Sequence, residues 1–278
     1  MTPALLTQIR SSTGEYRSTN QDAVGASPRT VTIADGVGGR AAGDVASASI
    51  THSVLHALTS RELAADGRDG RDDAIGPALL REIVAVANMR LAELSAADPS
   101  LIGMATTFTS VTCVGDSGLV VHIGDSRAYL VHDGVGRRVT RDDSLVQELV
   151  DQGAVDEADA WQHPHRNIIL RSLSGDPTDP EHLTITRTPT EPGDRWLLAS
   201  DGLTDYVEES VVLRVLVDEP DSAVAADRLL TLALAAEALD NVTLAVIDVV
   251  TDSEVDPTQA PPYVTAGSAL ARGRLGVV

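Results

Sequence analysis

The sequence Val31-Thr-Ile-Ala-Asp35-Gly-Val-Gly-Gly39 carries a short apolar run that ends in a carboxylate, followed by three glycines in four positions. The run predicts a strand over residues 28–34, and the glycines allow the main chain to pass close to an ion. Asp35 would then be a metal ligand, and the carbonyl oxygen of Gly36 a neutral second ligand. The alternative is a strand-to-helix turn in which Asp35 caps the following helix.

Three further aspartates, Asp22, Asp201 and Asp240, also occur in turn-forming contexts. Asp201 follows the apolar run 196–199 and Asp240 precedes the run 243–249, so strands would bring them to an end of a sheet. Two carboxylates about 4 Å apart repel each other by about 4 kcal/mol at an effective dielectric constant of about 20. A divalent cation that prefers oxygen ligands relieves this repulsion, so the set predicts a Mg²⁺ or Mn²⁺ site.

Outward from these residues, the sequence predicts helices and antiparallel strands in separate groups. The spacing of apolar residues predicts a helix over 41–58, a loop over 60–76, and a second helix that Pro77 opens. The rest of the chain predicts strands 107–114, 119–123 and 128–131, a short helix 144–153, an irregular segment 153–182, strand 196–200, helices 208–217 and 222–238, and strand 243–250. This segregation is typical of an α+β layered fold rather than a doubly wound sheet.

Composition excludes several classes of partner. The 278 residues carry a net charge of −20, which argues against nucleic acid or an anionic membrane as the main partner. The single cysteine, Cys113, excludes a disulfide framework. The first 15 residues lack a signal-peptide pattern, and the most apolar helical stretch, 229–239, is too short to span a bilayer. We therefore expect a cytoplasmic protein with no membrane partner.

Six short blocks carry a family resemblance when they are taken in order. They are Arg17…Asn20-Gln-Asp22, Asp35-Gly-Val-Gly-Gly39, Gly103-Met-Ala-Thr-Thr107, Gly124-Asp-Ser-Arg127, Ser200-Asp-Gly-Leu-Thr-Asp205 and Asp240-Asn241. Each block alone is weak, because Asp-Gly pairs are common in turns. Their order and spacing over about residues 10 to 250 resemble the protein phosphatase 2C-like (PPM) family, in particular its bacterial serine/threonine phosphatases.

The resemblance implies a fold and a division of the chain. The fold would be an antiparallel β-sandwich flanked by helix layers (α-β-β-α), with a dinuclear metal site at one end of the sandwich. Residues 1–250 would form the phosphatase domain, with an irregular, flap-like segment at about 140–182. Residues 251–278, which contain three prolines and several small residues, would form a flexible C-terminal tail.

The resemblance also implies roles for individual residues. Two Mn²⁺ or Mg²⁺ ions would be held by Asp22, Asp35, Gly36, Asp201 and Asp240. Arg17 would hold the substrate phosphate through its planar guanidinium fork; the alternative for Arg17 is a surface salt bridge.

A weaker third metal ion is implied at Asp125, with Asp201 or Asp205. A hairpin turn in which Asp125 bonds to its own main chain explains that residue equally well. Two departures from the family concern histidines: Val37 follows Asp35-Gly36 where some relatives carry a histidine acid, and Asp143 replaces the histidine of a Thr-x-Asp-His-Ser block.

The other histidines do not indicate a metal site. His52 and His56 lack the intervening glutamate of a His-Glu-x-x-His motif and are expected to be ordinary helix residues. His163 and His165 lie in the irregular segment, where a structural or flap role is expected.

The function implied is metal-dependent hydrolysis of phosphoserine and phosphothreonine in proteins by activated water. The partners would be phosphorylated proteins, either Ser/Thr kinases or their substrates, with the enzyme as a monomer. Two alternatives stay open: a partner-switching regulatory phosphatase with one dedicated phosphoprotein substrate, and a non-catalytic pseudo-phosphatase that binds phosphoproteins.

Overall fold

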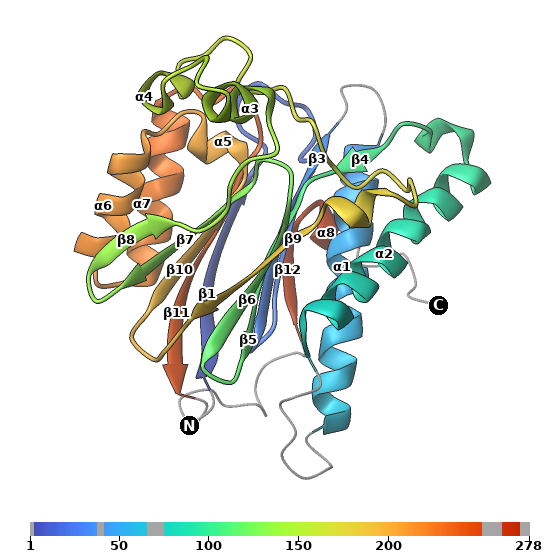
Figure 1. The fold of residues 1–278 in the computed structure, drawn as a ribbon, viewed down its shortest axis with the longest axis horizontal. Coiled ribbons are helices and arrows are strands. Elements are labelled where there is room, and N and C mark those ends of the chain that lie inside the picture. The colour runs from blue at the N-terminus through green and yellow to red at the C-terminus, as the bar shows by residue number, and fades with distance from the viewer. Residues whose placement is uncertain (1–2, 38–41, 66–74, 252–262, 273–278) are drawn as a thin grey trace.

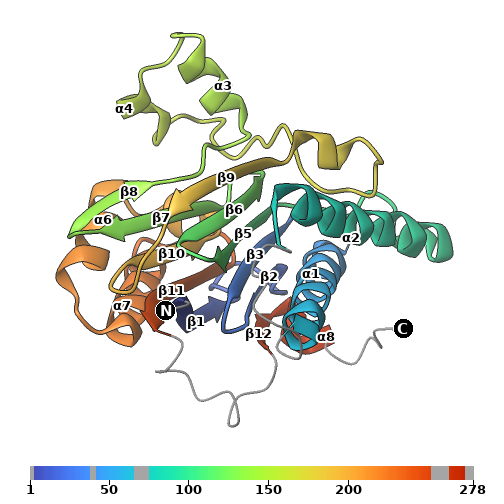
Figure 2. The ribbon, with the colours of Figure 1, turned by 60° about the horizontal axis from the view of Figure 1, so that its bottom comes forward.

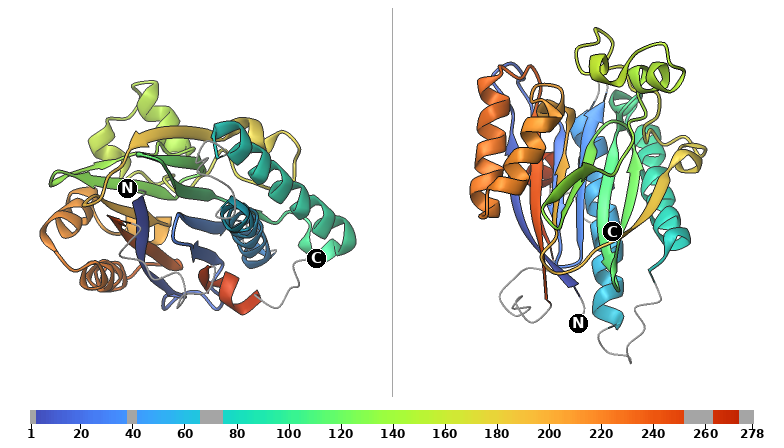
Figure 3. Two further views of the ribbon diagram at one scale, coloured as in Figure 1. Left: turned by 90° about the horizontal axis from the view of Figure 1, so that it is seen from below. Right: turned by 60° about the vertical axis from the view of Figure 1, so that its left-hand side comes forward.

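The computed structural model describes residues 3–37, 42–65, 75–251 and 263–272. In this part of the chain, two antiparallel sheets pack face to face and helices cover both outer faces (Figure 1). Other views show the layers following one another as helix, sheet, sheet and helix (Figure 3). The predicted α+β sandwich with α-β-β-α layers is therefore confirmed.

The first sheet has its strands in the spatial order β1-β11-β10-β7-β8, and two helices cover it. The bounds are β1 Pro3–Ser12, β11 Val242–Thr251, β10 Arg195–Ala199, β7 Arg127–His132 and β8 Val135–Arg138, with α6 Glu209–Asp218 and α7 Ser222–Ala235. In β10, Leu197 and Ala199 pack against the helix layer, while Trp196 and Leu198 pack against the other sheet. Successive side chains alternate between the faces, so this strand is apolar throughout because both of its faces are covered.

The second sheet has the order β12-β2-β3-β5-β6-β9, with β4 paired to β3. The bounds are β12 Val264–Gly267, β2 Asp22–Ala26, β3 Thr30–Val37, β5 Phe108–Val114, β6 Ser117–Ile123, β9 Thr184–Pro189 and β4 Ala105–Thr106, with covering helices α1 Gly43–Ala65 and α2 Pro77–Ala97. Ile50, Val54 and Leu58 of α1 are spaced four residues apart and are fully or almost fully buried. This spacing places them on the helix face that packs against the sheet.

Side chains from both sheets form a third core between them. Val24, Ile33, Val111, Leu130 and Ile247 all belong to it and are at most 1% exposed. Full burial of a Val or Ile side chain contributes about 1.5–3 kcal/mol relative to its exposure. This core fixes the relative position of the sheets, and therefore the position of the residues at their common end.

At one end of the sandwich, the connections between strands form an irregular layer that projects away from the sheets (Figure 2). It contains α3 Leu145–Asp151 and α4 Glu157–Ala160, and 3₁₀ turns at Pro99–Leu101 and Asp179–His182 lie elsewhere on the surface. Ser144 caps α3, because its side chain accepts a hydrogen bond from the Gln147 amide. The helix α5 (Asp201–Thr204) lies at the same end.

Several boundaries differ from the prediction. Strand β3 continues to Val37, so Asp35 and Gly36 lie within a strand and not in the turn after it; Gly38 and Gly39 lie outside the described residues. Helix α1 continues to Ala65, which shortens the loop predicted over 60–76. Strands β1, β2, β4, β8 and β9 were not predicted.

The C-terminal residues also differ from the flexible tail that the sequence predicts. Residues 264–267 form β12 on the edge of the second sheet, and Ser268–Arg272 form α8, which packs against α1. Residues 252–262 and 273–278 lie outside the described part of the chain. Among the helices that are described, none is both long and apolar enough to cross a membrane.

Candidate metal centre

The pairing of β2 with β3 brings two of the predicted ligands together. Asp22 is the first residue of β2 and stands directly opposite Asp35 of β3 in the antiparallel register. Directly opposite residues project from the same face, with their Cβ atoms about 4.5–5.5 Å apart. The expectation that these two aspartates lie in turns is wrong, because strand pairing rather than loop geometry brings them together.

The other two predicted ligands come from the first sheet. Asp201 is the first residue of α5, immediately after β10, and Asp240 precedes β11. Since β10 and β11 are antiparallel neighbours, the end of one and the start of the other meet at the same edge. A hydrogen bond across the sandwich joins this edge to β2: the Ser200 hydroxyl donates to Asp22 Oδ2 at 2.9 Å. The structure therefore brings Asp22, Asp35, Asp201 and Asp240 to one end of the sandwich.

Neighbouring carboxyl groups at this end contribute to raised pKa values of Asp35 and Asp22. Burial raises the pKa of Asp35 well above its usual range, and the charges of Asp22, Asp201, Asp125 and Asp240 raise it further. Burial likewise raises the pKa of Asp22 to about 6, although hydrogen bonds from hydroxyl groups oppose the shift. Carboxylates that are costly to ionise in the protein alone are suited to a site where a cation supplies the compensating charge.

Asp201 and Asp125 show the same effect. Burial raises the pKa of Asp201 well above its usual range, followed by the charges of Asp125, Asp205 and Asp240. Burial raises the pKa of Asp125 to about 8, with contributions from Asp142 and Asp205. The charges of the candidate third-ion residues therefore act on two of the predicted ligands, Asp35 and Asp201.

Two unpaired oxygen atoms test whether the residues fit a cation. Oδ1 of Asp201 and Oδ1 of Asp125 are buried and have no hydrogen-bond partner among the described residues. A buried polar atom without a partner costs about 1–3 kcal/mol, and more when it is charged. Hard-oxygen ligands of this kind match the preference of Mg²⁺ and Mn²⁺, so the donor set fits the predicted metal.

The glycines beside the aspartates have a packing role that the sequence did not indicate. A Cβ at Gly36 would collide with the main chain of Gly43, where the end of β3 crosses the start of α1. A Cβ at Gly202 would collide with the Asn241 carbonyl. These glycines allow neighbouring main chains to approach each other, and the carboxylates are held in place as a consequence.

Arg17 lies at the rim of the cluster. Its NH2 group donates to Asp240 Oδ2 at 2.5 Å, and its Nε donates to the Leu239 carbonyl at 3.2 Å. The side chain is 46% exposed, so this ion pair stabilises the fold by at most about 1 kcal/mol. The structure thus places Arg17 beside a predicted metal ligand, in the salt bridge that was the alternative to phosphate binding.

Asn241 holds the segment that carries Arg17 and Asp22. Its Oδ1 accepts a hydrogen bond from the Gln21 amide at 2.8 Å, and its Nδ2 donates to the carbonyls of Thr13 and Thr19 at 2.9 and 3.0 Å. Asn241 is 3% exposed and uses both ends of its amide. It belongs to the block Asp240-Asn241, but the sequence did not indicate this role.

A cavity of about 230 Å³ lies between the body and the flap, the segment 140–182 that carries α3 and α4. Asp125 and Asp205 line it on the side of the metal centre, and Trp161 lines it on the flap side. Arg166 of the flap reaches Asp205 Oδ2 at 3.0 Å and lies over the Tyr206 ring, 5.9 Å from its centroid. The flap therefore contacts Asp205, one of the candidate third-ion residues, directly.

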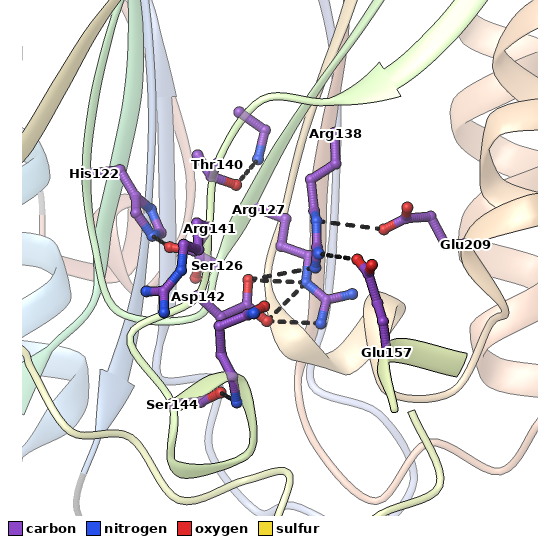
Figure 4. Close-up of polar contacts among 12 residues, drawn as sticks. His122, Ser126, Arg127, Arg138, Thr140, Arg141, Asp142, Ser144, Glu157 and Glu209 are labelled. Carbon is purple, nitrogen blue, oxygen red and sulfur yellow. Dashed lines mark hydrogen bonds and ion pairs between the residues drawn. The ribbon is translucent and has the colours of Figure 1, made fainter. Parts of the chain in front are cut away.

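A buried ion pair supports the wall of this cavity (Figure 4). Nε and NH2 of Arg127 donate to both oxygens of Asp142, at 2.7–3.1 Å. Arg138 lies near Asp142, Glu157 and Glu209 at 3.5–3.9 Å. Arginine thus compensates the charge of Asp142. Burial and neighbouring carboxylates, by contrast, raise the pKa values of Asp35 and Asp201.

The histidines lie as the sequence predicts. Val37 ends β3, opposite Ala105, and supplies no acid at that position. His163 and His165 lie in the flap, where the His165 amide donates to the His163 ring. His52 lies on α1, and its Nε2 is 2.8 Å from the Ala269 carbonyl.

One further group of potential ligands lies elsewhere. In the described part of the chain, possible ligand atoms of His132, Asp133 and Glu191 all lie within 4.8 Å of one another. All three residues are exposed, and His132 Nδ1 forms a hydrogen bond with Asp194 Oδ1 at 2.7 Å. Such groups are common on acidic surfaces, and this one is not part of the predicted site.

Comparison with known proteins agrees with the geometry. The sequence profile described as protein phosphatase 2C matches residues 14–238. The chain belongs to the protein phosphatase 2C family. The match contains all of the aspartates named above except Asp240, which follows it directly.

Individual family members are similar over most of the chain. The serine/threonine protein phosphatase PstP of Mycobacterium tuberculosis is 40% identical over 253 residues, which are 90% of this chain and 46% of PstP. The chain therefore spans about half the length of that relative. A putative protein phosphatase 2C-type of Streptococcus pyogenes is 32% identical over 86% of this chain and 95% of its own length.

A crystal structure of the PstP catalytic domain in complex with two manganese ions superposes with a TM-score of 0.78. The two chains are 38% identical, and the match covers 90% of this chain and 100% of that one. The protein phosphatase 2C fold that the sequence predicts is thus confirmed at the level of the whole sandwich.

Proposed function

We propose that the chain is a metal-dependent protein phosphatase that hydrolyses phosphoserine and phosphothreonine. The observation that carries the proposal is the convergence of four aspartates from both sheets. In three of them, Asp22, Asp35 and Asp201, burial and neighbouring carboxylates raise the pKa. Membership of the protein phosphatase 2C family supports it. The substrates would be phosphorylated proteins, either Ser/Thr kinases or their targets, in cytoplasmic signal transduction, with the enzyme as a monomer.

Two Mn²⁺ or Mg²⁺ ions would be held by Asp22, Asp35, the Gly36 carbonyl, Asp201 and Asp240, and a weaker third ion by Asp125 and Asp205. When bound, the ions supply Lewis acidity that lowers the pKa of a water molecule and neutralises charge on the phosphate. The chain's own contribution is to fix the ligands. Ser200 orients the Asp22 carboxylate, and the Thr107 hydroxyl oxygen accepts a hydrogen bond from the Asp35 main-chain amide at 3.0 Å.

Arg17 would bind the phosphate of the substrate. Its exposed guanidinium lies on Asp240, so it must exchange this partner for phosphate oxygens when the substrate binds. The guanidinium presents a planar fork of donors that matches two phosphate oxygens at once.

A covalent phospho-enzyme is not part of the proposal. The single cysteine, Cys113, is buried, and burial raises the pKa of its thiol to about 12. A thiol with this pKa is almost entirely protonated at neutral pH and is a poor nucleophile. The proposed nucleophile is therefore water.

The test uses the chain stripped of metal and then supplied with Mn²⁺ or Mg²⁺. Phosphate release from phosphoserine and phosphothreonine peptides should require the metal, and Asp201→Asn should abolish it. Asp133→Asn, a change at an exposed aspartate away from the cluster, serves as the matched control and should behave as wild type. Equal release in excess EDTA would contradict the proposal.

The same assay separates the two alternatives. A pseudo-phosphatase would bind a fluorescent phosphopeptide without releasing phosphate, whatever metal is added. A partner-switching phosphatase would release phosphate from one phosphoprotein and only slowly from unrelated peptides. The presence of all four metal aspartates favours hydrolysis over binding alone.

A further inference from the structure

The C-terminal residues 263–272 form a clamp against the second sheet, and they lie beyond the stretch matched by the family profile, which ends at 238. Strand β12 pairs antiparallel with β2, from Val264 opposite Ala26 to Gly267 opposite Ala23. Helix α8 then packs against α1 and β2 (Figure 2). Strand β12 of this C-terminal clamp therefore ends opposite Ala23, one residue away from Asp22, the first residue of β2.

At this point the clamp contacts the main chain of Asp22. The Ser268 hydroxyl donates to the Asp22 carbonyl at 2.9 Å, and Ser268 is only 3% exposed. Gly267 has a φ of +67°, and a Cβ at this residue would collide with the same carbonyl. Glycine is required here for two reasons: the left-handed conformation disfavours other residues, and no space is left for a side chain.

A second hydroxyl extends the contact to the neighbouring residue. The Ser47 hydroxyl of α1 donates to the Gln21 carbonyl at 2.5 Å and lies 2.9 Å from the Ser268 hydroxyl. The two hydroxyls have two protons for three short contacts, and either serine can be the donor between them. Both serines are buried, which makes the loss of either hydroxyl costly.

The clamp is anchored on α1 by His52. Its Nε2 lies 2.8 Å from the carbonyl of Ala269, a fully buried residue, and Tyr263 contacts the same ring edge-on at a centroid distance of 6.2 Å. A carbonyl can only accept, so Nε2 of His52 carries the proton. This role accounts for a histidine that the metal centre does not use.

We propose that Gly267 and Ser268 are positioning residues for the metal centre, which the docked C-terminal clamp holds through the main chain of Asp22. The inference rests on the proposed function, in which Asp22 is a metal ligand. The Asp22 carboxylate is held by Ser200, its amide donates to Asn20 Oδ1 at 3.1 Å, and its carbonyl is held by Ser268. Loss of the last contact keeps the hydrogen bond from Ser200 but allows the main chain of Asp22, and with it the carboxylate, to shift.

The experiment measures Mn²⁺ affinity by calorimetry on the full chain, with the melting temperature of the metal-free protein as a second readout. Ser268→Ala should weaken Mn²⁺ binding about tenfold, the lower end of the loss when a group that orients a metal ligand is removed. Gly267→Ala should weaken it further, because its Cβ displaces the Asp22 carbonyl. Phosphatase activity at limiting Mn²⁺ should fall in parallel with metal occupancy.

The matched control is Thr30→Ala, which removes a fully buried hydroxyl at the opposite end of the same sheet, where Thr30 donates to Thr112 at 3.1 Å. It should lower the melting temperature about as much as Ser268→Ala while leaving Mn²⁺ affinity unchanged. Wild-type affinity in Ser268→Ala would overturn the inference and leave the proposed function intact. Failure of the wild type to bind Mn²⁺ would overturn both.

Discussion

Replacing Asp22 by asparagine should stabilise the metal-free protein at alkaline pH. Burial raises the pKa of this carboxyl from 3.8 to about 6. The shift of about 2 units corresponds to about 3 kcal/mol at about 1.4 kcal/mol per unit. Because the pKa of the folded state is the higher one, the folded protein binds the proton more tightly. The contribution of this bound proton to the free energy of unfolding is present in full below pH 3.8 and is lost as the pH rises through about 6.

Asparagine carries no charge and can still accept the hydrogen bond from Ser200, so it avoids this loss. In EDTA at pH 8, urea unfolding should show Asp22→Asn more stable than wild type by about 3 kcal/mol, with a gap of about half that at pH 5. Added Mn²⁺ should make the wild type the more stable protein, because the ion binds the folded wild type and so stabilises it by mass action. The variant lacks one of the ligands and gains less from the ion.

Asp142→Asn provides the control for a carboxylate that is paired in the protein itself. It removes half of the buried ion pair with Arg127, so it should destabilise the metal-free protein at pH 8. The reasoning is refuted if Asp22→Asn is as unstable as Asp142→Asn under these conditions. The charge of Asp22 would then be compensated within the protein itself, as the charge of Asp142 is, and would not require a bound cation.

Three further predictions concern binding and proton transfer. Arg17→Ala should raise the KM for a phosphothreonine peptide, and Arg17→Lys should not restore it, since an ammonium lacks the two-pronged donor geometry; a wild-type KM in the lysine variant would reduce Arg17 to a general positive charge. Mn²⁺ binding at pH 6.5 should release protons, because the pKa of Asp22 is raised to about 6 and that of Asp125 to about 8. Calorimetry in buffers of different ionisation enthalpy measures the proton release, and binding heats that do not depend on the buffer would contradict the prediction. The double change of His163 and His165 to alanine should leave hydrolysis of both p-nitrophenyl phosphate and phosphothreonine unchanged, because water serves as the proton donor; selective loss of phosphothreonine turnover would reveal a histidine acid.

The sequence predicted the layers well because both sheets leave local patterns. Strands β5 and β6 are joined by a short turn, so their register follows from adjacency along the chain. Strands β10 and β11 are rich in apolar residues, which marks them as buried strands although they are far apart in the sequence. Strand β1 was missed because its residues 8–12 are polar, apart from Ile9, and only partly buried. Its partner residues in β11 lie at least 230 positions away in the sequence, and no local signal reveals such a pairing.

The sequence predicted which residues form the candidate site but not how the fold brings them together. Asp22 and Asp35 were expected in turns, whereas the register of β2 and β3 places them opposite each other. The docking of β12 and α8 depends on contacts of Ser268 and Ala269 with distant residues, which a stretch of prolines and small residues does not suggest. Local composition predicts whether a segment is polar or small; it does not predict a partner elsewhere in the fold.

The central claim is that the aspartate cluster makes hydrolysis depend on a divalent metal. The most direct measurement is phosphate release from a phosphothreonine peptide as Mn²⁺ is titrated into metal-stripped wild type and Asp35→Asn. The wild type should rise from no activity to saturation, and the variant should stay lower by orders of magnitude at every Mn²⁺ concentration while remaining folded. Activity of the wild type without metal, or a variant that reaches the wild-type rate, would contradict the account.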